Sequence, residues 1–207
     1  MKIFNRDIRF DTFVHKGMKK IDDRFGVYFV TGKQGSYKSY FAVYLTLRQD
    51  RTIVNYIKTN IHSLKIPGIE IKYFNKITEL YTDTDEHCIY IIDEISRKYD
   101  KNSRTDTQFY AWLNQSRKRK RVVILITQEW KELPMWIRRP AKYMICTKPM
   151  FLLGKFGFLT TVVGDGENLV YNKEEGEYEA PPILYIYHKR NKRYADMYDT
   201  FEPINEL

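Results

Sequence analysis

A glycine-rich loop directly after a short apolar run is the feature that most restricts how this chain can fold. The apolar run covers residues 27–30, and the next nine residues, 31–39, read Thr-Gly-Lys-Gln-Gly-Ser-Tyr-Lys-Ser. Between a buried strand and a helix, such a loop turns its backbone N–H groups toward a polyphosphate. The segment therefore predicts a nucleotide site at the end of the first strand.

The loop contains the two side chains that phosphate chemistry needs. The Lys38 ammonium is placed to neutralise the β- and γ-phosphate oxygens, and the Ser39 hydroxyl to ligate Mg²⁺. The pattern Gly-x4-Gly-Lys-Ser/Thr is broken at Tyr37, where tyrosine replaces the last glycine, so a side chain has to fit beside the phosphates. Without other support, the loop is equally a plain strand-to-helix turn. The residues predicted to bind ATP are Gly32, Lys33, Gln34, Gly35, Ser36, Tyr37, Lys38 and Ser39.

A second apolar run, residues 88–92, ends in Asp93 and Glu94. It predicts a buried parallel strand that delivers two carboxylates to the carboxyl edge of a sheet, where ligands of open α/β folds bind. Asp93 would hold Mg²⁺ and Glu94 would polarise the attacking water as general base. A core strand that stops at two solvated acids is the alternative. The preceding loop favours the catalytic interpretation.

A third apolar run follows Arg121 at residues 122–126 and leads into Thr127 and Gln128. We expect the Gln128 amide to face the γ-phosphate beside Glu94. Between the second and third runs, residues 105–120 predict a helix with apolar side chains at near-helical spacing. This helix is expected to end in the basic run 117–121.

Strands and helices alternate along residues 25–147, which predicts an α/β fold with right-handed crossovers and a mostly parallel sheet. A strand is expected at 52–57 and a helix at 129–138. Residues 1–23 are assigned to an N-terminal arm, 24–148 to the core, and 149–207 to a β-rich C-terminal appendage of the same domain.

Within the appendage, residues 158–163, a turn at 164–166 and residues 169–172 predict a β-hairpin, with a further strand at 183–188. The most apolar stretch, 150–163, is interrupted by Lys155 and too short to cross a bilayer, so no membrane-spanning helix is predicted.

The formal net charge of +9 suggests a polyanionic partner. Residues 97–121 hold nine Lys or Arg against two Asp. We expect this basic segment to lie beside the nucleotide site and to meet DNA phosphates, the alternative being a solvated helix end. A smaller basic patch at 189–194 predicts either a DNA contact or a polar turn.

Taken together, these motifs resemble the FtsK-HerA group of P-loop ATPases, in which the glycine-rich loop, the Asp-Glu strand, an arginine before the next strand and Thr-Gln at its end occur in this order. Within that group the chain is most similar to the zonula occludens toxin-like ATPases of filamentous phages and to small viral DNA-packaging ATPases. Residues 52–61, which contain Thr-Asn-Ile at 59–61, resemble the second strand of that family, and residues 115–119 resemble its arginine-bearing helix end. The resemblance covers roughly residues 24–148.

The resemblance implies a P-loop NTPase of the additional-strand, catalytic-glutamate type that uses ATP and Mg²⁺. It implies a homo-oligomeric ring in which Arg117, or else Arg119, reaches the active site of the neighbouring subunit. The implied partners are double- or single-stranded DNA and a viral capsid or membrane-associated assembly protein. The implied location is the host cytoplasm, at the virion or its assembly site.

Four other functions stay open at this point. The first is a phage-assembly ATPase that extrudes single-stranded DNA. The second is a partitioning-type switch, which Lys33 directly after Gly32 favours and Glu94 opposes. The third is a small-molecule kinase, for which the motifs leave no evident lid or acceptor pocket. The fourth is a non-hydrolysing, nucleotide-stabilised DNA-binding subunit, which Tyr37 permits.

Overall fold

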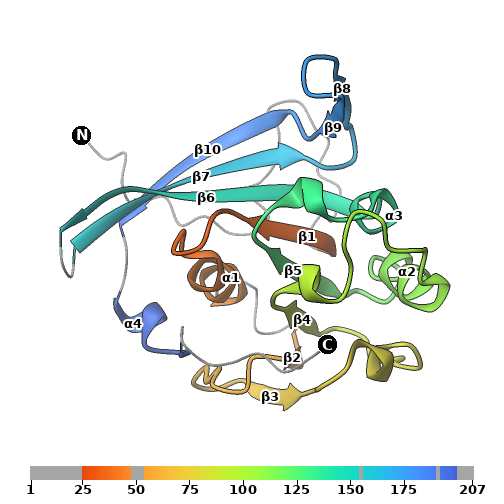
Figure 1. Ribbon diagram of the computed structural model, residues 1–207. Helices are drawn as coiled ribbons and strands as arrows, with labels where there is room; N and C mark the ends of the chain where they lie inside the picture. Colours follow the sequence, from red (N-terminus) through yellow and green to blue (C-terminus); the bar gives the residue numbers. More distant parts are fainter. Residues whose placement is uncertain (1–24, 48–53, 154–155, 190–191, 200–207) are drawn as a thin grey trace.

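An eight-stranded sheet organises the molecule, with strand order β10-β7-β6-β1-β5-β4-β2-β3 (Figure 1). The computed structural model describes residues 25–47, 54–153, 156–189 and 192–199. The strands of the sheet are β1 (Gly26–Thr31), β2 (Tyr56–Thr59), β3 (Glu70–Tyr73), β4 (Ile89–Ile92), β5 (Val122–Thr127), β6 (Ala141–Leu153), β7 (Phe156–Asp165) and β10 (Pro182–Lys189). The helices are α1 (Lys38–Leu47), η2 (Ile77–Leu80), η3 (Ile95–Arg97), α2 (Thr107–Asn114), η4 (Trp130–Glu132), α3 (Met135–Arg138) and α4 (Lys192–Ala195).

The strands from β6 to β3 in this order are parallel. β1 pairs with β5 on one side and with β6 on the other, and β4 lies between β5 and β2. An extra strand, β5, thus separates the strand that precedes the glycine-rich loop from the strand that precedes the two carboxylates. This arrangement confirms the predicted α/β P-loop fold and brings the carboxyl ends of β1, β4 and β5 to one edge.

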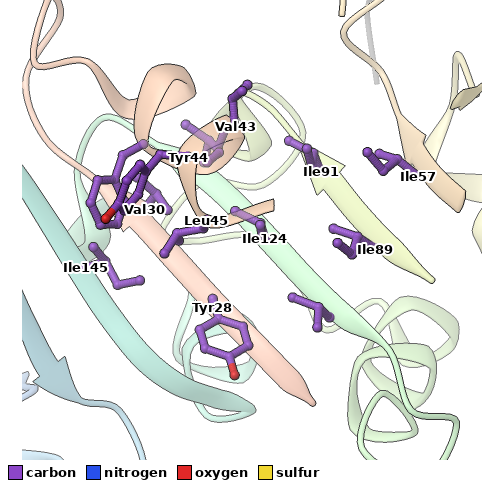
Figure 2. Packing of buried hydrophobic residues seen from close by; sticks show 14 of the residues in the cluster. Tyr28, Val30, Val43, Tyr44, Leu45, Ile57, Ile89, Ile91, Ile124 and Ile145 are labelled. Carbon is purple, nitrogen blue, oxygen red and sulfur yellow. The ribbon is translucent and has the colours of Figure 1, made fainter. Parts of the chain in front are cut away.

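Helices cover both faces of the sheet, as the alternation of side chains along the strands requires. Along β1, Tyr28 and Val30 join the core on the α1 face, while Val27 and Phe29 join the core on the α2 face. Figure 2 shows Leu45 of α1 lying over the first of these faces. Each fully buried side chain of this kind contributes about 1.5–3 kcal/mol to stability, so the two cores hold the three layers together.

Beyond the parallel half, β6, β7 and β10 extend the same sheet in antiparallel fashion. The prediction that residues 164–166 turn the chain back from 158–163 onto 169–172 is wrong. β7 pairs with β6 and β10, whereas β8 (Val170–Asn172) pairs with β9 (Glu177–Glu179) in a separate two-stranded sheet. Gly164 and Asp165 still belong to β7, where they pair with β6, and the chain bends only at residues 166–168.

Several predicted boundaries also shift. The helix expected at 105–120 ends at Asn114, and residues 115–120 form turns that include Lys120 at a φ of 51°. The helix expected at 129–138 is divided into η4 and α3 around Pro134, which has no N–H to continue a helix. The strand expected at 52–57 begins at Tyr56 within the described chain and continues to Thr59. The N-terminal arm, 1–23, lies outside the described residues.

A buried arginine joins the amino end of β5 to the loop before β4. Arg121 has an exposed fraction of 0%. Its Nε donates to the Asp85 carbonyl oxygen at 2.6 Å and its Nη2 to the Asp83 carbonyl oxygen at 2.8 Å. The guanidinium lies 5.4 Å from the Tyr90 ring centroid and 5.3 Å from that of Trp112. The side chain thus links a loop, a strand and α2.

We expect Arg121→Ala to lower the free energy of unfolding by about 3–5 kcal/mol, because it removes a buried guanidinium that pairs with the Asp83 carboxylate, 3.5 Å from Nη2 to Oδ1, and donates to two backbone carbonyls. Urea denaturation would measure the change. Lys118→Ala, which alters an exposed lysine of the same basic run, is the control and should stay within about 0.5 kcal/mol of wild type. Equal effects of the two substitutions would contradict a structural role for Arg121.

Candidate nucleotide-binding site

The glycine-rich loop begins at the carboxyl edge of the sheet, where its start is tied to the end of β5. The Gly32 N–H donates to the Gln128 carbonyl oxygen at 3.1 Å, and the Thr31 hydroxyl donates to the same oxygen at 3.1 Å. Within the loop, the Ser36 N–H donates to the Lys33 carbonyl oxygen at 3.0 Å. Residues Gly32 to Ser36 therefore form a closed turn before α1 starts at Lys38.

Backbone conformation explains which loop positions need glycine. Gly32 has a φ of 149°, and a Cβ there would lie 2.6 Å from the Thr147 carbonyl oxygen of β6, so only glycine fits. Tyr37 has a φ of 65°, the left-handed conformation that glycine adopts without strain. Its ring packs edge-on against Tyr40, with centroids 6.4 Å apart. The chain thus keeps the conformation of the glycine that the motif lacks.

Lys38 lies within the curve of the loop. Its Nζ donates to the Lys33 carbonyl oxygen at 3.2 Å. Burial lowers the pKa of the Lys38 ammonium, and the carboxylates of Asp93 and Glu94 oppose that shift. Few protein acceptors satisfy this ammonium, which leaves donor capacity for phosphate oxygens.

Asp93 is a buried carboxylate held by three segments of the chain. Its exposed fraction is 9%. The Ser39 hydroxyl donates to Asp93 Oδ2 at 3.0 Å, and the Glu94 N–H donates to Oδ1 at 2.8 Å. The Asn60 side chain forms two hydrogen bonds with the backbone of Asp93. Asn60 Nδ2 donates to the Asp93 carbonyl oxygen at 3.0 Å, and Asn60 Oδ1 accepts from the Asp93 N–H at 2.8 Å. Desolvation by burial raises the pKa of the Asp93 carboxyl.

These oxygens fit a magnesium ion. Mg²⁺ prefers oxygen ligands, retains several waters and binds through one or two protein groups together with substrate phosphates. Ser39 and Asp93 would supply the hydroxyl and the carboxylate, and a cation would offset the cost of a buried negative charge at Asp93. The predicted metal ligands are thus adjacent in the structure.

Glu94 follows at the same strand end but points into a different environment. Its backbone is left-handed, with φ 52° and ψ 44°, and its side chain is 30% exposed. The carboxylate forms an ion pair with Arg97 Nε. The Gln128 side chain is exposed at the same sheet edge, so the structure brings the loop, Asp93, Glu94 and Gln128 together.

Arg117 and Arg119 lie at the opposite edge of the sheet. The Gly26 N–H donates to the Arg121 carbonyl oxygen, which places the whole basic run at the amino ends of β1 and β5. The six residues of β1, at about 3.3 Å each, separate it from the loop. The expectation that segment 97–121 lies beside the nucleotide site is therefore wrong for all but its first residues. Both arginines follow α2 in turns: Arg117 pairs with Glu167, and Arg119 donates to Gln115 Oε1 and to the Thr84 carbonyl oxygen.

Sequence reasoning missed two residues of the site. Asn60 was noted only as part of a Thr-Asn-Ile segment, and its hydrogen bonds to Asp93 were not anticipated. Arg97 was counted only as part of a basic segment. Its position three residues after Glu94 is a signal for a local ion pair, which the structure contains.

Comparison with known proteins identifies the family. The family model for zonular occludens toxin (Zot) matches residues 26–150. The chain belongs to this family. The match begins at β1 and extends into β6, so it includes every strand end that contributes to the candidate site. No curated protein sequence matches the chain significantly.

Solved structures share the fold. The N-terminal domain of zonular occludens toxin from Neisseria meningitidis is 17% identical, with a TM-score of 0.55 over 84% of this chain and 98% of that one. The genome packaging NTPase B204 of Sulfolobus turreted icosahedral virus 2, in complex with ATP-gammaS, is 16% identical, with a TM-score of 0.52 over 77% of this chain and 98% of B204. The same NTPase in complex with sulfate is 14% identical, with a TM-score of 0.51 over 77% of this chain and 97% of that one.

Within the described part of the chain, no helix has the length and apolar character needed to cross a bilayer. The second basic patch, 189–194, has most of its side chains outside the described residues.

The raised pKa of Asp93 leads to a prediction about stability without metal or nucleotide. The native state keeps a proton on this carboxyl at pH values where the unfolded chain, with a pKa near 3.8, has released it. The free energy of unfolding should therefore fall as pH rises through that interval. Asp93→Asn should remove this dependence.

Thermal unfolding at pH 5 and pH 8 in EDTA would test this, with the Tm difference, variant minus wild type, larger at pH 8. Added Mg²⁺ should raise the Tm of wild type at pH 8 and leave Asp93→Asn unchanged. A Tm difference that is the same at both pH values would contradict the assignment.

Proposed function

We propose that this chain is the subunit of an ATP-driven motor that moves or packages the DNA of a virus or mobile element, working as a homo-oligomeric ring in the host cytoplasm at the assembly site. The observation that carries the proposal is the adjacency of Lys38, Ser39, Asp93 and Glu94 at one sheet edge, with the Ser39 hydroxyl bonded to Asp93. Membership of the Zot family and the fold shared with a genome packaging NTPase support it.

The chemistry follows from the order of these groups along the edge. Lys38 and the loop N–H groups would bind the β- and γ-phosphates, and Ser39 and Asp93 would hold Mg²⁺, which would supply positive charge beside the phosphoryl oxygens. Glu94 orients and deprotonates the attacking water once its carboxylate is released from Arg97. Gln128, at the end of β5, senses the γ-phosphate and transmits its presence to the loop through its own backbone.

A phage-assembly ATPase that extrudes single-stranded DNA is the second candidate. The family match over residues 26–150 and the likeness to the Neisseria Zot domain favour it. Both candidates use the same active site and differ in the DNA they act on. Stimulation of ATP hydrolysis by double-stranded or by single-stranded DNA distinguishes them.

We expect Glu94→Gln to keep ATP affinity and to lower turnover by about 10²–10⁴-fold, because a general base acts in the transition state and not in the ground state. Lys38→Ala should instead abolish binding, since it removes the ammonium that meets the phosphates. Calorimetry with an ATP analogue and a phosphate-release assay, each with and without DNA, would separate the two effects. Wild-type turnover in Glu94→Gln would exclude Glu94 from catalysis, and wild-type affinity in Lys38→Ala would refute the loop assignment.

The location of Arg117 supports a role in a neighbouring active site. Within one chain it lies at the amino edge of the sheet, away from its own loop, so it cannot reach its own nucleotide. In a ring that stacks the amino edge of one subunit on the carboxyl edge of the next, it meets the neighbour's γ-phosphate. A planar guanidinium suits the spread charge of the transferring group.

Subunit mixing tests this role. We expect Arg117→Ala to reduce DNA-stimulated turnover by about 10³-fold or more, as for other trans-acting arginines. Mixing Arg117→Ala subunits with Glu94→Gln subunits should recover part of the activity wherever an intact arginine faces an intact base. Arg119→Ala tests the other candidate in the same way, and Lys118→Ala is the control. Full activity of Arg117→Ala, or of a monomer, would rule out the trans mechanism for Arg117.

A further inference from the structure

A pocket of about 320 Å³ lies at the amino edge of the sheet, opposite the nucleotide site. It is bounded by the start of β1, the end of α2 with the turn after it, the start of β6 and the loop after β7. Figure 1 shows α2 and α3 beside this end of β1. The polar side chains that line it are Asn114, Ser116, Arg117, Arg139, Lys142 and Glu167.

The charge of this lining favours an anion. Three cations, Arg117, Arg139 and Lys142, face one carboxylate, Glu167. The stem of Lys142, which is only 3% exposed, forms part of the pocket wall. The stems of Lys142 and Arg117 converge beside Gly26, where a Cβ would be in ordinary van der Waals contact with Lys142 Cδ at 3.4 Å and with Arg117 Cγ at 3.8 Å.

The Ser116 hydroxyl provides a second, independent observation. Ser116 is 1% exposed and lines the pocket, and its Oγ has no hydrogen-bond partner among the residues that the structure describes. Buried hydroxyls are nearly always hydrogen-bonded in proteins, so an orphaned one calls for an explanation. A ligand with acceptor oxygens would satisfy this hydroxyl and would suit the positive charge of the pocket lining.

Within the chain, the Glu167 carboxylate already supplies part of the negative charge that such a ligand would bring. Its carboxylate pairs with Arg117. The turn that carries it is held by the Glu167 N–H, which donates to Asp165 Oδ1 at 3.0 Å, and packs so closely that a Cβ on Gly166 would lie 2.7 Å from the Ala141 carbonyl oxygen. A carboxylate is thus fixed where an external anion would bind Arg117.

We infer that this pocket binds a phosphate group through Ser116, Arg139 and Lys142, and that Glu167 competes with the phosphate for Arg117. A phosphate presents several acceptor oxygens with concentrated negative charge, which suits a small site with two guanidinium groups and an ammonium. Two sources supply such a group: the backbone of a nucleic acid and the nucleotide held by an adjacent copy of this chain. Only the second source rests on the proposed function.

Direct binding of pyrophosphate tests the pocket independently of ATP hydrolysis. Calorimetry would be done on full-length Lys38→Ala protein, in which the glycine-rich loop no longer binds phosphates. We expect measurable binding that is weakened about tenfold by Arg139→Gln and several-fold by Ser116→Ala, and tightened by Glu167→Gln. Ser116→Ala removes an unsatisfied hydroxyl and should fold normally, and Lys118→Ala should bind like the Lys38→Ala parent. No binding, or equal affinity in Arg139→Gln and Ser116→Ala, would overturn the inference.

Two further measurements separate the sources. If the phosphate belongs to nucleic acid, an oligonucleotide displaces pyrophosphate, and Arg139→Gln reduces the salt dependence of oligonucleotide binding by about one released ion. If it belongs to the neighbour's nucleotide, Arg139→Gln loses turnover and regains it on mixing with Glu94→Gln subunits. If both tests fail and Arg139→Gln binds pyrophosphate with unaltered affinity, the pocket has no phosphate-binding function. That result leaves the assignment of the nucleotide site unchanged.

Discussion

The buried carboxylate of Asp93 is the constraint on which the rest of the site depends. A negative charge at a strand end with little access to water is tolerated only when donors surround it. Those donors come from α1 through Ser39 and from the next peptide unit through the Glu94 N–H, while Asn60 holds the backbone. The Asp93 side chain therefore ties α1 to the end of β4, and the Asp93 backbone ties the end of β2 to the same point.

The parts of the site closest in sequence were the most predictable. The glycine-rich loop and the acids after β4 are local patterns, in which an apolar run and the residues after it are contiguous. Their convergence follows from parallel strands, whose carboxyl ends share an edge. The Gly32 position is likewise explained by one contact, the approach of Thr147 from β6.

The failures of prediction came from features that depend on distant partners. The basic segment 97–121 starts at the carboxyl end of β4 and finishes at the amino end of β5, so counting its charges could not locate it. The pairing of β7 was misjudged because the sequence Gly-Asp-Gly at 164–166 is typical of a turn, whereas Gly164 and Asp165 pair with the distant strand β6. The role of Asn60 was overlooked because its side chain bonds to the backbone of Asp93, and no sequence motif marks a hydrogen bond to the backbone of a distant residue.

The placement of two sites on opposite edges of one sheet has a consequence for assembly. A contact that joins the carboxyl edge of one copy to the amino edge of the next uses two different surfaces and is heterologous. It has no two-fold axis, so each added subunit buries one of these surfaces and leaves the other open for the next copy. Whether the series closes into a ring or grows into a helix then depends on the rotation between successive subunits. The turn after α2 lines the amino-edge pocket, so a small change in this turn would alter both the pocket and the symmetry of the assembly.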